Sequence, residues 1–185
     1  MKSEVTEPKL RAIWRVDSTH SSVEFAAKHM AVATVKGRFT DVVGMIVGDL
    51  NDPANAQIEV EIATARVDTG NSQRDWHLRS ADFLNAADYP TISFRSTKIE
   101  PLGEDNFWVR GDLQIRGKAR EVNLVGSVDG ETVNQLGEEV IGMSAETTVI
   151  PKDFGLTWNL PLPAGGWLIG NELRVELHLE AIREL

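Results

Sequence analysis

The 185-residue chain contains no cysteine, and this absence excludes several kinds of chemistry. Disulfide bonds, thiol nucleophiles, cysteine-ligated zinc and lipid attachment through cysteine all require that residue. Basic residues are also few: 19 lysines and arginines stand against 28 aspartates and glutamates, for a formal net charge of −9. A negative field repels phosphate backbones, so we expect no nucleic-acid partner.

Long apolar runs are missing as well. No stretch approaches 18 consecutive apolar residues, so no membrane-spanning helix is expected. The first ten residues, MKSEVTEPKL, lack the apolar segment of a secretory signal peptide. The chain as written is therefore expected in the cytoplasm, and a periplasmic or secreted location follows if a leader was removed. We expect residues 1–10 to be loose and residues 11–185 to form one domain.

Period-two alternation dominates what is present. In residues 57–63 (QIEVEIA), three apolar residues share one face and two glutamates share the other, and residues 173–179 repeat the pattern. Such alternation is typical of a sheet with one buried and one solvated face. Further strands are predicted at residues 22–29, 40–48, 91–99, 107–115, 120–128 and 141–150.

Short turn sequences between these strands indicate antiparallel hairpins. We therefore predict an all-β fold, in which about eight strands close into an antiparallel barrel. A barrel of this size either is filled by side chains or holds one small ligand, and the pattern alone favours neither. Residues 40–48 are apolar on both faces, so Val43, Met45 and Val47 are predicted to contact either a covering helical insertion or a partner subunit in a homodimer.

Residues 68–90 (DTGNSQRDWHLRSADFLNAADYP) interrupt the strands near one end of the barrel. We predict a helix over residues 71–80 and another helical turn over residues 80–87 with Ser80 as its N-cap. Asp75 and Arg79 have the spacing of an ion pair along one helical face, and Trp76 and Phe83 are expected to dock on the barrel.

The same segment resembles a catalytic cluster, but its spacing is unfavourable. Asp75 and His77 are two residues apart, so on a helix they point in different directions. A structural role is therefore favoured for His77, through a hydrogen bond to a backbone carbonyl. His29 is expected on the inward face of its strand, where it either contacts a neighbour or points at a ligand. No metal-binding or nucleophile motif is present, so no metal or cofactor is expected.

Ordered sequence blocks covering residues 13–182 resemble the YceI family. They are residues 14–25 (WRVDSTHSSVEF), 28–30 (KHM), 35–39 (VKGRF), 68–71 (DTGN), 74–75 (RD), 77–78 (HL), 82–83 (DF), 89–90 (YP), 92–94 (ISF), 96–97 (ST), 111–113 (GDL), 115–117 (IRG) and 153–156 (DFGL). The resemblance implies a lipocalin-like barrel of eight strands with short helical segments near one end. It also implies binding of an isoprenoid or another long-chain lipid, since family members include polyprenyl-pyrophosphate and fatty-amide binders.

We therefore predict a non-enzymatic protein that binds, stores or transports an isoprenoid or fatty-chain lipid in the barrel lumen, with no other cofactor. The predicted lumen residues are Val23, Phe25, Ala27, His29, Phe94, Phe107, Val109, Leu113 and Ile115. Arg74, His77 and Arg79 are the candidates for contact with a polar head group. Two alternatives stay open: an enzyme acting on a bound lipid through Asp75 and His77, and a ligand-free barrel that binds a protein partner.

One departure from the family pattern concerns the position two residues before Asp153-Phe154-Gly155. The family commonly has an arginine there, whereas this chain has Pro151 followed by Lys152. We expect Lys152 to take over the role of that arginine.

Overall fold

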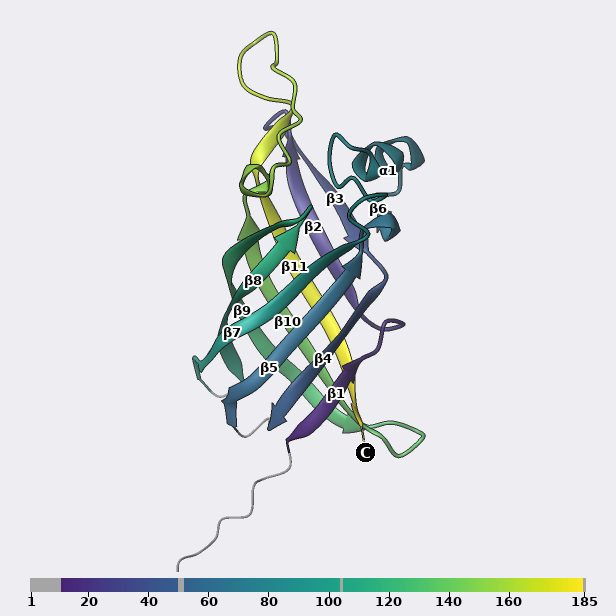
Figure 1. Cartoon of the computed structure of the whole chain (residues 1–185), viewed down its shortest axis with the longest axis vertical. Helices are drawn as coiled ribbons and strands as arrows, with labels where there is room; N and C mark the ends of the chain where they lie inside the picture. Colours follow the sequence, from purple (N-terminus) through teal and green to yellow (C-terminus); the bar gives the residue numbers. More distant parts are fainter. Residues whose placement is uncertain (1–10, 50–51, 104, 185) are drawn as a thin grey trace, which may run out of the picture.

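The computed structural model describes residues 11–49, 52–103 and 105–184 (Figure 1). The segment predicted to be loose, residues 1–10, lies outside the described residues. The strands are β1 (Ala12–Val16), β2 (Ser22–His29), β3 (Ala33–Phe39), β4 (Val42–Asp49), β5 (Asp52–Ala63), β6 (Val67–Asp68), β7 (Thr91–Pro101), β8 (Asn106–Ile115), β9 (Lys118–Val133), β10 (Glu139–Val149) and β11 (Ile169–Glu184). The helical elements are η1 (Thr64–Arg66), α1 (Ser72–Arg79) and η2 (Pro151–Phe154).

Eight of these strands form the predicted closed antiparallel barrel. The order is β1-β4-β5-β7-β8-β9-β10-β11, and pairing of β1 with β11 closes the ring. The long strand β11 pairs with β1 near its end, through residues 181–184, and with β2 earlier, through residues 169–178. Strands β2, β3 and β6 therefore extend the wall of the barrel at one end only, which we call the upper end (Figure 1).

The alternation predicted for residues 57–63 is confirmed. Val60 and Ile62 are buried in the barrel, whereas Glu59 and Glu61 are exposed on the outer surface. Arg95, opposite Glu59 on the neighbouring strand β7, donates from Nε to its carboxylate at 3.0 Å. The inner faces of the strands supply the core, and Ile58 packs against each of its three clusters of buried side chains.

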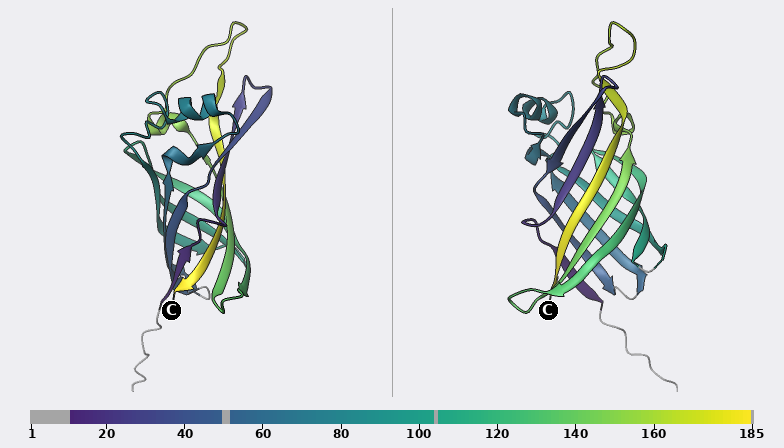
Figure 2. Two further views of the ribbon diagram at one scale, coloured as in Figure 1. Left: turned by 90° about the vertical axis from the view of Figure 1, so that its right-hand side faces the viewer. Right: turned by 180° about the vertical axis from the view of Figure 1, so that it is seen from behind.

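The helical insertion lies at the upper end, beside β3 and β6 (Figures 1 and 2). It does not cover β4, where Val43 and Met45 are exposed, so the prediction of a covering helix over this strand is wrong. The homodimer alternative for the same face stays a prediction. Within the described residues, no helix has the length and apolar character needed to cross a membrane.

Helix α1 confirms the predicted helix to within a residue at each end. Asn71 is its N-cap, and its side-chain oxygen accepts a hydrogen bond from the Arg74 backbone N–H at 3.0 Å. Ser80 is the C-cap of this helix, and its hydroxyl also accepts from the Asp82 backbone N–H at 3.3 Å, as predicted for an N-cap, although turns follow it in place of a regular helix. Residues 81–84 and 86–88 form turns, since the backbone N–H of Asn85 returns to the Ser80 carbonyl.

Two side-chain contacts hold residues 69–90, which we call the lid, against the barrel. Arg116, in the turn between β8 and β9, donates to the Phe83 carbonyl at 3.0 Å. The buried Thr64 hydroxyl donates to the Tyr89 carbonyl at 2.8 Å. Because backbone carbonyls of the lid accept both bonds, its path depends little on which side chains it carries at these positions.

Candidate functional site

An apolar cavity of about 120 Å³ lies inside the barrel, toward its lower end. Every one of the eight barrel strands contributes to its lining, which includes Trp14, Ile46, Ile58, Phe94, Val109, Leu124, Met143 and Leu177. An apolar cavity of roughly 150 Å³ accepts a molecule the size of benzene. The cavity in this structure thus has the size of a small apolar group. A longer lipid chain would fit only if side chains of the lumen moved aside.

The predicted lumen residues fall into three groups. Phe94, Phe107 and Val109 line the cavity. Four others pack within or against the apolar cluster above it: Val23, Phe25, Leu113 and Ile115. Ala27 is half-buried on β2, and His29 lies in a groove at the upper end.

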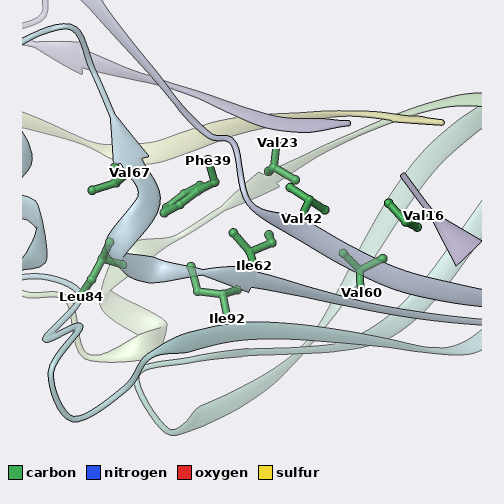
Figure 3. Close-up of a cluster of buried hydrophobic side chains, with 9 residues drawn as sticks. All are labelled: Val16, Val23, Phe39, Val42, Val60, Ile62, Val67, Leu84 and Ile92. Carbon is green, nitrogen blue, oxygen red and sulfur yellow. The ribbon is translucent and has the colours of Figure 1, made fainter. Parts of the chain in front are cut away.

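A cluster of nine buried side chains separates the cavity from the upper end (Figure 3). On β4, β5 and β7 the cluster residues lie nearer to the lid than the cavity residues do. Val42, Ile62 and Ile92 lie above Ile46, Ile58 and Phe94 on these three strands. Val67 and Leu84 come from β6 and the lid, and they pack with Phe39 and the inward residues of the barrel. This upper lumen cluster consists of Val16, Val23, Phe39, Val42, Val60, Ile62, Val67, Leu84 and Ile92.

Glycine at position 111 makes room for one of the cavity aromatics. A Cβ atom on Gly111 would lie 2.4 Å from Cζ of Phe94 and 2.5 Å from the Arg95 carbonyl oxygen. The ring of Phe94 therefore lies over the backbone of the neighbouring strand, where any larger residue would displace it.

Trp14 is the polar exception among the large cavity residues. Its indole is 5% exposed, and among the described residues its Nε1–H has no hydrogen-bond acceptor. A buried donor without a partner costs free energy, so such groups are rare in folded proteins. At the cavity's lower part, the Ser127 and Ser144 hydroxyls already donate to Asp129 at 2.7 and 2.9 Å.

A second, open groove of about 950 Å³ lies at the upper end. Its lining brings together His29 from β2 with Arg74 and His77 from the lid, residues that are distant in sequence. Trp76 and Leu168 add apolar surface. Arg79, the third head-group candidate, is not among the lining residues and instead approaches the Ala65 carbonyl at 3.5 Å.

Arg74 and Asp75 are both bonded to Thr69. The Asp75 carboxylate is buried and accepts from the Thr69 N–H at 2.9 Å and from the Thr69 hydroxyl at 2.6 Å. Arg74 donates from Nε to the Thr69 hydroxyl at 2.7 Å and from its terminal nitrogen to the Thr69 carbonyl at 2.9 Å. The predicted Asp75–Arg79 ion pair is therefore replaced by a bond network around Thr69, which fixes the start of the lid.

His77 bonds to a carboxylate instead of the predicted backbone carbonyl. Its Nε2 lies 2.8 Å from Oδ2 of Asp82, and its ring packs edge-on against Phe83 and Trp158 with centroids 4.9 and 4.6 Å away. Asp75 and His77 thus have different partners, and no shared catalytic geometry joins them. Trp76 is 69% exposed, so its predicted docking on the barrel is wrong.

The departure at position 151 places a proline at the start of η2, a position where a helix tolerates it. Phe154 in the same element is buried in the barrel, and Nζ of Lys152 lies 5.8 Å from the centre of the Trp167 ring. That Lys152 takes over the role of the family's arginine stays a prediction.

A charged cluster lies on the outer surface near the turn between β1 and β2. His20 Nδ1 is 2.8 Å from an Asp17 oxygen and 3.4 Å from a Glu180 oxygen. The hydrogen bond to Asp17 and the charge of Glu180 raise the pKa of His20. The Thr19 backbone N–H and the His20 ring lower the pKa of Asp17. Glu180 is 160 residues away from His20 along the chain, so no local sequence pattern indicates this contact.

The fold agrees with the comparison to known proteins. The family described as YceI-like domain matches residues 14–181. The chain belongs to the YceI-like family. Its similarity to Protein YceI of Escherichia coli O17:K52:H18 is 35% identity over 144 residues, which cover 78% of this chain and 75% of that protein.

Solved structures show the same fold as this YceI-like chain. BcnA of Burkholderia cenocepacia superposes with a TM-score of 0.77 at 22% identity, over 89% of this chain and 98% of that one. A polyisoprenoid binding domain from Saccharophagus degradans, described as implicated in plant cell wall breakdown, gives a TM-score of 0.64 at 14% identity. That comparison covers 92% of this chain and 98% of the other. At these identities the likeness concerns the fold alone.

Proposed function

We propose that this YceI-like protein is a non-enzymatic carrier or store that holds the apolar chain of an isoprenoid or similar lipid in its lumen. The apolar cavity lined by all eight barrel strands carries the proposal. Each buried methylene contributes about 0.8 kcal/mol, so a long chain binds tightly with few polar contacts. The related fold described as a polyisoprenoid binding domain supports the same ligand class.

A chain longer than the cavity needs the upper lumen cluster to open. Leu84 and Val67 enter that cluster from the lid and β6, so a shift of the lid would join the cavity to the upper end. Met143 offers adaptable space below, because methionine has an unbranched, flexible side chain. The head group would then lie in the upper groove, near His29, Arg74 and His77.

The decisive experiment fills the cavity without otherwise altering the surface. Ala145 lines the cavity, and the phenyl group added by Ala145→Phe has the size of the molecule that such a cavity accepts. We expect this variant to fold and to lose most uptake of a polyprenyl phosphate or a fatty amide, as measured by native mass spectrometry.

The matched control places the same side chain on the outside of the barrel. Val125 is exposed on β9, so Val125→Phe should bind both lipids like the wild type. Equal lipid binding by a folded Ala145→Phe variant would overturn the proposal, and so would a wild-type protein that takes up neither lipid.

A further inference from the structure

The upper end of the barrel carries apolar side chains on its most protruding loops. The β2–β3 turn and the connection from η2 to β11 extend beyond the barrel body (Figures 1 and 2). The Met30 backbone N–H donates to the Leu168 carbonyl at 2.8 Å, and the Leu168 N–H donates to the Leu160 carbonyl at 2.9 Å, so turn and connection form one unit. The exposed apolar side chains of this unit, which we call the rim tips, are Met30, Val32, Leu160 and Trp167.

Charge is distributed very unevenly between the rim tips and the lower end. Residues 29–35 and 157–171 contain no aspartate, glutamate, lysine or arginine, although 25% of the whole chain is charged. At the lower end, the described residues 49, 52, 100–103, 105–106 and 129–139 include acidic residues but no lysine or arginine. The net charge of −9 is therefore concentrated away from the rim tips.

Three lysines flank the rim tips. Lys28 and Lys36 lie on the two strands of the β2–β3 hairpin, and Lys152 lies beside Trp167. Among the described residues these lysines form no ion pair, and Lys28 donates only to the Thr34 hydroxyl at 3.0 Å. By contrast, many cations of the barrel wall are paired, as Arg95 is with Glu59 and Arg183 with Glu139.

The β2–β3 turn also has an unfavourable sequence for its backbone. Met30 and Ala31 have φ values of 51° and 59°, and the Val32 N–H closes the turn on the His29 carbonyl at 3.1 Å. Two consecutive residues with positive φ favour Asn-Gly, whose conformational cost is low. Positive-φ strain at residues other than glycine clusters at functional sites, so this turn is a candidate for a role beyond stability.

We propose that the rim tips and their lysines dock the upper end of the barrel on an anionic membrane surface. Apolar side chains with tryptophan enter the interface between lipid head groups and chains, while adjacent lysines are attracted to anionic lipids. The acidic lower end would be repelled, which orients the barrel with its upper groove toward the bilayer. Docking extends the proposed lipid-carrier function, because it brings the groove to the lipid source.

The test uses co-flotation of the full chain with vesicles of phosphatidylcholine alone and of phosphatidylcholine with phosphatidylglycerol. We expect binding to the anionic vesicles that weakens with added salt. Trp167→Ser should weaken it about tenfold or more, because the indole no longer enters the interface. Lys28→Gln and Lys36→Gln should each weaken it about fivefold.

Two further variants separate docking from folding. Leu136 is 83% exposed in the turn between β9 and β10 at the lower end, so Leu136→Ser should bind vesicles like the wild type. The double variant Met30→Asn with Ala31→Gly should melt at or above the wild-type temperature and still bind vesicles more weakly.

Three results would overturn docking: no binding to anionic vesicles, equal binding by Trp167→Ser, or self-association through Trp167 in light scattering without vesicle binding. The carrier function is tested separately, because Ala145→Phe alters the lumen and leaves the rim tips in place. That variant should still float with anionic vesicles while failing to take up lipid.

Discussion

At the scale of single residues, Trp14 is the most informative side chain of the lumen. Its indole lines the cavity and its Nε1–H lacks an acceptor among the described residues. We predict that Trp14→Phe destabilises the lipid-free protein by much less than the roughly 3–5 kcal/mol of a buried Trp→Ala substitution, because removal of the unsatisfied donor offsets part of the lost packing. Chemical denaturation of delipidated protein measures this change.

The same substitution should weaken binding of a fatty amide and of a hydrocarbon chain that lacks an acceptor to the same extent. The amide head group is proposed to lie in the upper groove, so only the apolar tail reaches Trp14. Greater weakening for the amide would place its carbonyl next to the indole and would contradict the proposed orientation of the ligand.

His20 and Asp17 make stability depend on pH in opposite directions. The pKa of His20 is raised, so the stability it adds is fully present below its unfolded value of roughly 6.5 and is lost as pH rises through the raised pKa. The pKa of Asp17 is lowered, so its contribution is present above roughly 3.9 and is lost as pH falls through the lowered pKa.

We therefore expect wild-type protein to resist urea better at pH 6 than at pH 8.5, with a smaller difference in His20→Gln. An NMR titration of the His20 ring should show directly that its pKa is raised above the ordinary value for histidine. An equal pH difference in wild type and variant would assign the effect to other groups.

At the scale of elements, the sequence predicts backbone better than side-chain partners. The alternation at residues 57–63 and the capping residue Asn71 both report local preferences, and both predicted elements are found. The spacing of Asp75 and Arg79 also fits an ion pair on one helical face. The Asp75 carboxylate instead accepts hydrogen bonds from Thr69, which lies outside the helix. Such competition depends on tertiary contacts that no local pattern contains.

The lid gives a prediction at the same scale. Leu84→Ala removes a buried side chain of the upper lumen cluster and should destabilise the protein by about 2–5 kcal/mol. If this cluster closes the path to the cavity, the variant should also take up a fluorescent fatty-acid analogue faster in stopped-flow measurements. Leu102→Ala, at an exposed position, is the control and should change neither quantity. Destabilisation with unchanged uptake kinetics would place the path elsewhere.

At the scale of the whole molecule, closure of eight strands was predictable and the state of the interior was not. Alternation assigns Phe25 and Phe94 to the same inward face, but one packs with the upper lumen cluster and the other lines the cavity. The difference depends on neighbours that are distant in sequence: Phe25 lies beside Phe39 in the cluster that Leu84 of the lid joins, whereas Phe94 lies over Gly111. The division of the lumen into a packed upper part and a cavity below it therefore follows only from the three-dimensional packing.

Removal of lipid provides the prediction for the whole barrel. A ligand that binds only the folded state at one hundred times its dissociation constant stabilises it by about 2.7 kcal/mol. For a chain of this length, each kcal/mol shifts the melting temperature by roughly 2–4 °C, so lipid-loaded protein should melt about 5–10 °C above delipidated protein. Calorimetry with and without added polyprenyl phosphate measures the shift, and Ala145→Phe should show none. Identical melting of loaded and delipidated wild type would indicate that the lipid does not bind the folded barrel, because a chain held in the lumen cannot avoid this coupling.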